Sequence, residues 1–274
     1  MVKKEWTNLR HDPQLNVGLL HAYYIEHTYP RHSHDYFVVC LIERGYQSFI
    51  HGGLKHVTQP GGIILINPGE VHTGEAADRS GFEMRCFYPT AAHMEMAALE
   101  LTGHHQPLTF FKQVRIDDLQ ARRSILSLHR AMSEGASSLE CESRFSWTLA
   151  QLVKRYGGIS TAQQRMGKEK KAVQRARSYI EEHFADGVSL QELARFVDLS
   201  PYYFLRVFRA EVGMPPYSYL ESVRIIRAQR LIESGSSLAE VAMEAGFSSQ
   251  SHMTNSFKKI IGATPGQYAQ QNRS

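Results

Sequence analysis

The chain has 274 residues, of which 42% are hydrophobic and 21% charged, an ordinary composition for a globular protein with one large or two smaller domains. It contains no run of about 18 apolar residues, and no apolar stretch follows its basic start. The sequence therefore predicts neither a transmembrane helix nor a signal peptide, and it favours the cytoplasm. The net charge of +4 is only a weak indication of a polyanionic partner.

The first part of the chain is predicted to be rich in β-strands, from about residue 17 to residue 88. Two apolar runs, Tyr36–Ile42 and Ile63–Ile66, each end at residues typical of turns. Between them, Pro60-Gly61-Gly62 suits a tight turn, because proline fixes φ and glycine accepts positive φ. Short strands separated by such turns predict a small β-sandwich or β-barrel.

Beyond Arg115 the apolar residues recur at helical spacing. Asp117 is a candidate N-cap for a first helix, whose apolar positions include Leu119, Ile125, Leu126 and Met132. A second helix is predicted from about Leu139 to Tyr156, with one apolar stripe made by Phe145, Leu149, Leu152 and Tyr156. This helical pair must bury its apolar faces either against the strands or against a second subunit.

Residues 157–171 are polar and poorly periodic, which predicts a linker. It separates an N-terminal domain (1–156) from a C-terminal domain (172–270) that looks entirely helical. The expected fold class is therefore α+β with two domains, a β-barrel with a helical pair followed by an all-α domain.

The three cysteines, Cys40, Cys86 and Cys141, are far apart in the sequence. They form no Cys-x-x-Cys pair of the kind that binds metal or carries redox chemistry. Free cysteine is usually a buried residue, so we expect three reduced thiols in the core.

The C-terminal domain contains an internal repeat. Ser189 and Ser237 each open a segment Ser-Leu-x-Glu-Leu/Val-Ala, and the Ser-x-x-Glu start is the capping box of a helix. Each copy then needs a tight break, which Asp198 and Gly246 suit because both residue types tolerate a left-handed backbone. Farther on, Phe208, Gly213, Pro216 and Tyr219 recur as Phe257, Gly262, Pro265 and Tyr268.

A short capped helix, a turn and a second helix form the unit that places a recognition helix in the major groove of DNA. We predict two such helix-turn-helix units, at about residues 189–212 and 237–261, which would read adjacent major-groove segments. Pro216–Ser234 is predicted to form one longer helix that connects the units rigidly. Its mostly inward positions are Leu220, Val223, Ile226, Leu231 and Ile232.

Four further motifs lie in this region: Gly213-x-x-Pro216-x-x-Tyr219-Leu220, Arg224-x-x-x-Ala228-x-x-Leu231-Ile232, Ala242-x-x-x-Gly246-Phe247, and Phe257-Lys258-Lys259-x-x-Gly262-x-Thr264-Pro265-x-x-Tyr268. With them, residues 172–270 resemble the DNA-binding domain of the AraC/XylS family of transcription regulators. The resemblance implies a sequence-specific regulator, more often an activator, that forms a homodimer and works with RNA polymerase. Asp198 departs from the family pattern, because glycine is frequent at that turn; DNA binding is still expected.

The predicted DNA contacts are the polar residues on the outward faces of the two recognition helices: Tyr202, Arg206, Arg209, Gln250, Ser251, His252, Asn255, Lys258 and Lys259. The inward faces are predicted to hold Phe204, Val207, Phe208, Met253 and Phe257. Arg206 suits the two acceptors of guanine, whereas Gln250 and Asn255 have the amide geometry that suits adenine. Lys258 and Lys259 suit phosphates, which position a protein without reading sequence.

Most of the 14 histidines lie in the first half of the chain. His32-Ser33-His34 and the segment from Gly62 to His72 resemble the two motifs of the cupin barrel, which AraC-type regulators commonly use as a sensor domain. The resemblance implies a small-molecule effector pocket in the barrel, and our candidates to line it are His32, His34, Tyr36 and His72.

No metal or other cofactor is expected in this pocket. Metal-binding cupins carry an acidic residue four or five positions after the second histidine, and here those positions are Val38 and Val39. If a metal were bound, its ligands would be His32, His34 and His72.

Three functions remain open on the sequence. The leading hypothesis is an effector-responsive, DNA-binding regulator without enzymatic activity. The second is a metal-dependent cupin enzyme, a dioxygenase or an isomerase, that carries a DNA-binding tail. The third is an architectural DNA-binding protein whose barrel only forms the dimer.

Overall fold

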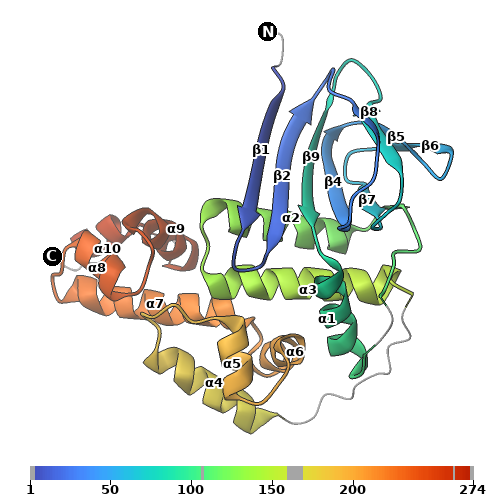
Figure 1. The fold of residues 1–274 in the computed structure, drawn as a ribbon. Helices are drawn as coiled ribbons and strands as arrows, with labels where there is room; N and C mark the ends of the chain where they lie inside the picture. The colour runs from blue at the N-terminus through green and yellow to red at the C-terminus, as the bar shows by residue number, and fades with distance from the viewer. Residues whose placement is uncertain (1–3, 106–107, 159–168, 262, 272–274) are drawn as a thin grey trace. The chain divides into compact units, whose positions relative to one another are not determined.

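The computed structural model describes residues 4–105, 108–158, 169–261 and 263–271 (Figure 1). The chain forms two compact units, Met1–Gly135 with Arg144–Gln164, and Ala136–Ser143 with Arg165–Ser274. Most of the predicted linker, residues 159–168, lies outside the described residues, so the domain boundaries remain a prediction. Within the described residues, no helix has both the length and the apolar character needed to cross a bilayer.

The N-terminal strands form two antiparallel sheets (Figure 1). In the six-stranded sheet the spatial order is β1 (Trp6–Asp12), β2 (Val17–Tyr24), β9 (Phe82–Tyr88), β4 (Val38–Gly45), β7 (Ile63–Ile66) and β10 (Arg115–Ile116). In the four-stranded sheet it is β3 (Tyr29–His32), β8 (His72–Ala76), β5 (Gln47–His51) and β6 (Leu54–Thr58). The expected β-rich domain is present, but its described strands make two sheets rather than a closed barrel.

Central strands β4 and β7 are buried on both faces, which explains why they read as unbroken apolar runs. Cys40 and Ile64 lie in the core cluster between the two sheets. Their neighbours Leu41 and Ile63 point to the other face and are fully buried as well. A strand with one exposed face would alternate apolar and polar residues instead.

Three helices belong mainly to this part of the chain: α1 (Ala91–Thr102), α2 (Leu119–Glu134) and α3 (Ser138–Tyr156). The cap of α2 is Asp118, whose Oδ1 accepts from the amides of Gln120 at 2.8 Å and Ala121 at 3.0 Å, so the prediction of Asp117 was wrong by one residue. Leu119, predicted to point inward, is 59% exposed. The predicted range of α3 is confirmed to within one residue, whereas β1 and α1 were not predicted.

The C-terminal part is helical throughout its described residues (Figure 1). Its helices are α4 (Lys170–Glu182), α5 (Leu190–Phe196), α6 (Pro201–Val212), α7 (Pro216–Glu233), α8 (Leu238–Glu244), α9 (Gln250–Ile261) and α10 (Pro265–Gln271). Helix α7 has 18 residues, about 27 Å of rigid rod. It contributes Leu220 to the core of the first helix-turn-helix unit and Ile225 to that of the second. The predicted inward position Ile226 is wrong, because this side chain is 50% exposed and Ile225 is buried in its place.

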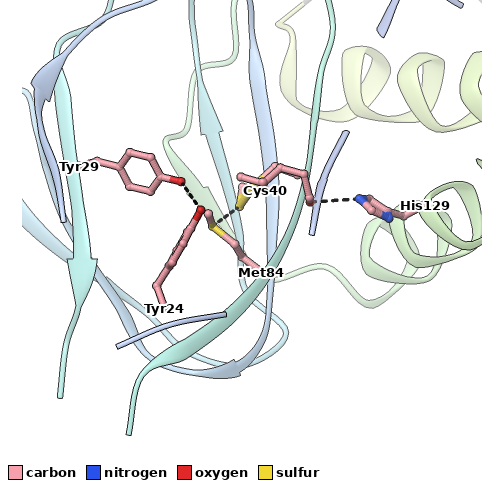
Figure 2. The surroundings of a disulfide bond; sticks show 7 residues. Tyr24, Tyr29, Cys40, Met84 and His129 are labelled. Atoms are coloured by element: carbon pink, nitrogen blue, oxygen red, sulfur yellow. Dashed lines mark hydrogen bonds between the residues drawn. A yellow bond between two sulfur atoms is a disulfide. The ribbon is translucent and has the colours of Figure 1, made fainter. Parts of the chain in front are cut away.

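Two of the cysteines form a disulfide, Cys40–Cys86, and only Cys141 fits the predicted reduced core thiol among the described residues. The two partners are 46 residues apart in sequence, but the pairing of β4 with β9 sets Cys40 directly opposite Cys86. The register of two strands is a tertiary feature, so the sequence spacing gave no sign of this bond. Figure 2 shows Tyr24 and Tyr29 on one side of the disulfide and His129 on the other.

His129 of α2 joins this helix to the outer face of the six-stranded sheet. Its Nε2 lies 3.1 Å from the carbonyl oxygen of Leu20, which can only accept, so Nε2 carries the hydrogen (Figure 2). Its Nδ1 faces the guanidinium of Arg85 at 3.3 Å, which can only donate. Burial, reinforced by the positive charge of Arg85, lowers the pKa of His129 to about 4.

This pKa predicts a loss of stability in acid. The folded-state pKa lies below that of an unfolded histidine, about 6.5, so the neutral ring contributes stability above pH 6.5 that is lost as the pH falls towards 4. The resulting decrease in the free energy of unfolding should reach about 3 kcal/mol. Urea unfolding at several pH values, followed by the fluorescence of Trp6 and Trp147, measures it. In His129→Gln, which keeps a donor for Leu20, the free energy of unfolding should depend less steeply on pH than in the parent protein. The exposed control His183→Gln should keep the pH dependence of the parent.

Candidate nucleic-acid interface and ligand pocket

Both helix-turn-helix units have the same local construction. In each, the capping box is complete: Ser189 Oγ accepts from the amide of Glu192 at 3.1 Å, and Ser237 Oγ accepts from that of Glu240 at 3.4 Å. The turns are also equivalent, because Asp198 and Gly246 both have positive φ, 59° and 77°. After each turn a backbone amide donates back to the first helix, Leu199 to Ala194 and Phe247 to Ala242, both at 2.9 Å. The repeat in the sequence is therefore a repeat in structure.

The second helix of each unit, α6 and α9, buries its apolar face as predicted. Phe204, Phe208, Met253 and Phe257 are completely buried and Val207 almost so. Ser200 and Ser249 cap these helices, with their hydroxyls accepting from the amides of Tyr203 and His252. The opposite faces of α6 and α9 carry polar and basic side chains.

Arg224, in the middle of α7, ties the two units together. Its guanidinium is 7% exposed and donates to the carbonyl oxygens of Phe184 at 2.7 Å and Asp186 at 3.0 Å, in the loop before the first unit. It also lies 6.0 Å from the ring of Phe247 in the second unit. Desolvation by burial lowers the pKa of Arg224 from its usual value.

Gly246, in the turn of the second unit, also lies against the loop before the first unit and shows how closely the two approach. A Cβ at this position would come within 2.6 Å of the Cα of Ala185. Position 246 therefore requires glycine for two reasons, its positive φ and this close backbone contact. At Asp198 the positive φ is the only constraint of the two.

A hollow of about 610 Å³, counting its open mouth, lies between the two N-terminal sheets. Its walls combine apolar side chains with a ring of polar ones, and among its lining residues are Tyr29, His32, His34, Tyr36, Gln47, His72 and Tyr88. Burial lowers the pKa of His34 and His72 and raises that of Tyr29, Tyr36 and Tyr88. These five groups are therefore uncharged at neutral pH, and the hollow suits a ligand that is held by hydrogen bonds.

Comparisons with known proteins agree with this geometry. Residues 15–149 match the family model described as the AraC-like ligand binding domain, and residues 193–271 match that of a helix-turn-helix domain. The uncharacterized HTH-type transcriptional regulator YbfI of Bacillus subtilis (strain 168) is 32% identical over 252 residues, which cover 92% of this chain and 91% of YbfI. The protein belongs to the AraC family of transcription regulators.

Two further relatives carry names that describe activators. The HTH-type transcriptional activator RhaS of Klebsiella pneumoniae (strain 342) is 23% identical over 241 residues, 86% of each chain. The virulence regulon transcriptional activator VirF of Yersinia enterocolitica is 35% identical over 95 residues, 34% of this chain and 35% of VirF. This AraC-family protein is thus a DNA-binding transcription regulator.

The structure places most of the predicted DNA contacts on exposed faces of the two recognition helices. Exposed are Arg209, Gln250, Ser251, Asn255, Lys258 and Lys259, and partly exposed are Arg206 and His252. The predicted outward orientation of Tyr202 is wrong, because its side chain is only 3% exposed and the guanidinium of Arg206 lies 6.0 Å from its ring. A large aromatic ring gains more from burial than a polar tip gains from water.

Two of the exposed contacts are already engaged in the free protein. The Nζ of Lys259 lies 3.5 Å from Glu221 of α7, and the Nδ1 of His252 lies 3.0 Å from the hydroxyl of Ser248.

All four candidates for the effector pocket line the hollow, but the sequence analysis missed Gln47, Tyr29 and Tyr88. Gln47 is the most informative of these, because its buried Oε1 has no hydrogen-bond partner among the described residues. It lies at the start of β5, and no sequence motif pointed to it.

Removing the guanidinium of Arg224 should destabilise the C-terminal part of the protein. Arg224→Met would keep the packing volume but leave two buried carbonyl oxygens without donors, at a cost of roughly 2–3 kcal/mol. Chemical unfolding of the full chain by circular dichroism, which follows the helices, measures this. The matched control is Arg227→Met, an exposed residue of the same helix, which should change stability by less than about 0.5 kcal/mol. Equal effects of the two substitutions would contradict the role given to Arg224.

Proposed function

We propose that this protein is an effector-responsive activator of transcription, a homodimer that reads adjacent major-groove segments with α6 and α9. The observation that carries the proposal is the pairing of two matched, outward-facing recognition helices with a separate, uncharged, partly polar pocket. A purely architectural DNA-binding protein would need the first feature but not the second. Contacts with RNA polymerase are part of the proposal, on the family resemblance and the names of the relatives.

DNA reading is divided between the two helices in this proposal. Arg206 of α6 bonds guanine, and Gln250 and Asn255 of α9 bond adenine, because their donors and acceptors match those base edges. Lys258 and Lys259 neutralise phosphates and set the register of the protein on the duplex. Arg209, Ser251 and His252 complete the contact face, whereas Tyr202 supports Arg206 from below.

The effector is proposed to bind in the hollow between the sheets. The lone acceptor Gln47 Oε1 and the uncharged histidines and tyrosines favour a small ligand that donates hydrogen bonds, set against the apolar wall. Binding shifts the regulator only if the ligand has different affinities for two arrangements of the dimer or of the DNA-binding domains.

We further propose that the protein has no enzymatic activity and acts in the cytoplasm, with the DNA that it binds. Its relatives are named as transcriptional regulators, and nothing about them favours a cupin enzyme with a DNA-binding tail.

Arg206→Ala and Lys259→Ala should weaken operator binding in different ways. Arg206→Ala should cost ~1–3 kcal/mol and relax the preference at one base pair, whereas Lys259→Ala should weaken all sequences and reduce the salt slope by about one. Binding to an operator found by genome-wide mapping, measured against single-base variants at several salt concentrations, separates the two effects. Equal, sequence-independent losses would show that these roles are wrongly assigned.

The effector should raise the unfolding temperature of the protein. A ligand that binds only the folded state stabilises it, by about 2.7 kcal/mol at a concentration 100 times its Kd. A thermal-shift screen of small metabolites, chosen from the genes next to the mapped binding sites, would find it. Gln47→Leu should fold normally but lose most of the shift. Were no compound to stabilise the protein or alter its DNA binding, the architectural role would be favoured.

A further inference from the structure

Three imidazoles converge on the polar side of the pocket. His32 ends β3 and His72 begins β8, and the pairing of these strands sets the two residues directly opposite each other. His34 follows two residues after His32. One nitrogen from each ring lies within 4.8 Å of the other two, and the ring centroids of His32 and His72 are 4.4 Å apart.

The backbone fixes the same tautomer in all three rings. The Nδ1 atoms of His32, His34 and His72 lie 2.8, 2.8 and 2.9 Å from the carbonyl oxygens of Pro30, Tyr36 and Glu70. A carbonyl oxygen can only accept, so each Nδ1 carries the hydrogen, and in the neutral ring each Nε2 is a bare acceptor. Metal-binding histidines are held in this way, with one nitrogen donating to a backbone carbonyl and the other free for the metal.

Nothing else in the described part of the chain satisfies these Nε2 atoms. No donor side chain of the described residues lies within hydrogen-bond distance of them, so all three are free to bind a ligand. Glu70, two residues before His72, is engaged elsewhere: it lies 3.0 Å from His51 and accepts from the amide of Asn67. The carboxylate next to His34 in sequence, Asp35, is exposed. Tyr36 stacks on His34 with ring centroids 4.3 Å apart, which holds that ring in place.

We propose that His32, His34 and His72 bind one divalent transition-metal ion through their Nε2 atoms, with zinc as the best fit, and that its open coordination position faces the effector pocket. The expectation of no metal rested on the missing carboxylate at Val38 and Val39. However, three neutral imidazoles are a sufficient ligand set for zinc, which then keeps a fourth position for water or a ligand. Zn–N bonds of 2.0–2.1 Å require nitrogens roughly 3.3 Å apart, so nitrogens that now lie within 4.8 Å of one another would close by at most about 1.5 Å.

This inference deepens the proposed effector pocket, but its test does not depend on DNA. Tag-free, full-length protein is stripped with a chelator and titrated with zinc chloride by calorimetry, and with cobalt(II) chloride by absorption spectroscopy. We expect one equivalent of zinc per chain, a rise in unfolding temperature, and the visible absorption of four-coordinate cobalt with nitrogen ligands. His34→Ala and His72→Ala should each weaken zinc binding at least 100-fold, whereas His183→Ala, an exposed histidine of the C-terminal part, should bind as the parent does.

The outcomes that overturn the proposal are a lack of zinc binding by the parent protein, or equal affinities in the parent and in the pocket variants. If both alanine variants fail to fold, His72→Gln serves instead, and the cobalt spectrum of the parent still reports whether nitrogen ligands are present. Operator binding by the stripped protein separates the two hypotheses: if it persists while no metal binds, the zinc site is refuted and the regulator is not.

Discussion

The buried guanidinium of Arg224 is the contact on which the geometry of DNA reading depends. It comes from the connecting helix, satisfies two carbonyl oxygens of the loop before the first unit, and lies against an aromatic ring of the second. A buried charge is costly unless its donors are used, so these contacts stabilise the three parts in this arrangement. These contacts therefore hold the two helix-turn-helix units in one arrangement. In the proposed function, the effector would have to act on both units together.

In the N-terminal part, polar side chains line a pocket between two largely apolar sheets. Strands β4 and β7 are buried on both faces and supply the rigid wall. The polar residues come mainly from the smaller sheet and from the segment after β3, where backbone carbonyls orient the histidine rings. Desolvation lowers the pKa of His34 and His72 and favours their neutral form, whose free nitrogen can accept a hydrogen bond or bind a metal.

Local patterns were sufficient for the helical half. Capping boxes, the positive-φ positions Asp198 and Gly246, and the spacing of Phe204 and Phe208 act over one or two turns, and each proved correct. The errors arose where a neighbour distant in sequence decided the outcome. Tyr202 was assigned outward from helical periodicity and Ile226 inward, but burial depends on what packs against the helix and not only on its period.

Residue patterns alone predicted a β-rich domain followed by two tandem helix-turn-helix units, because these elements are specified by contacts between residues close in sequence. Three features became visible only in the folded chain: the strands form two sheets, Cys40 pairs with Cys86, and Gln47 lines the pocket beside three converging histidines. Those features depend on the pairing and register of strands 20 to 50 residues apart. A shift of one residue in that register would turn each of these side chains to the opposite face.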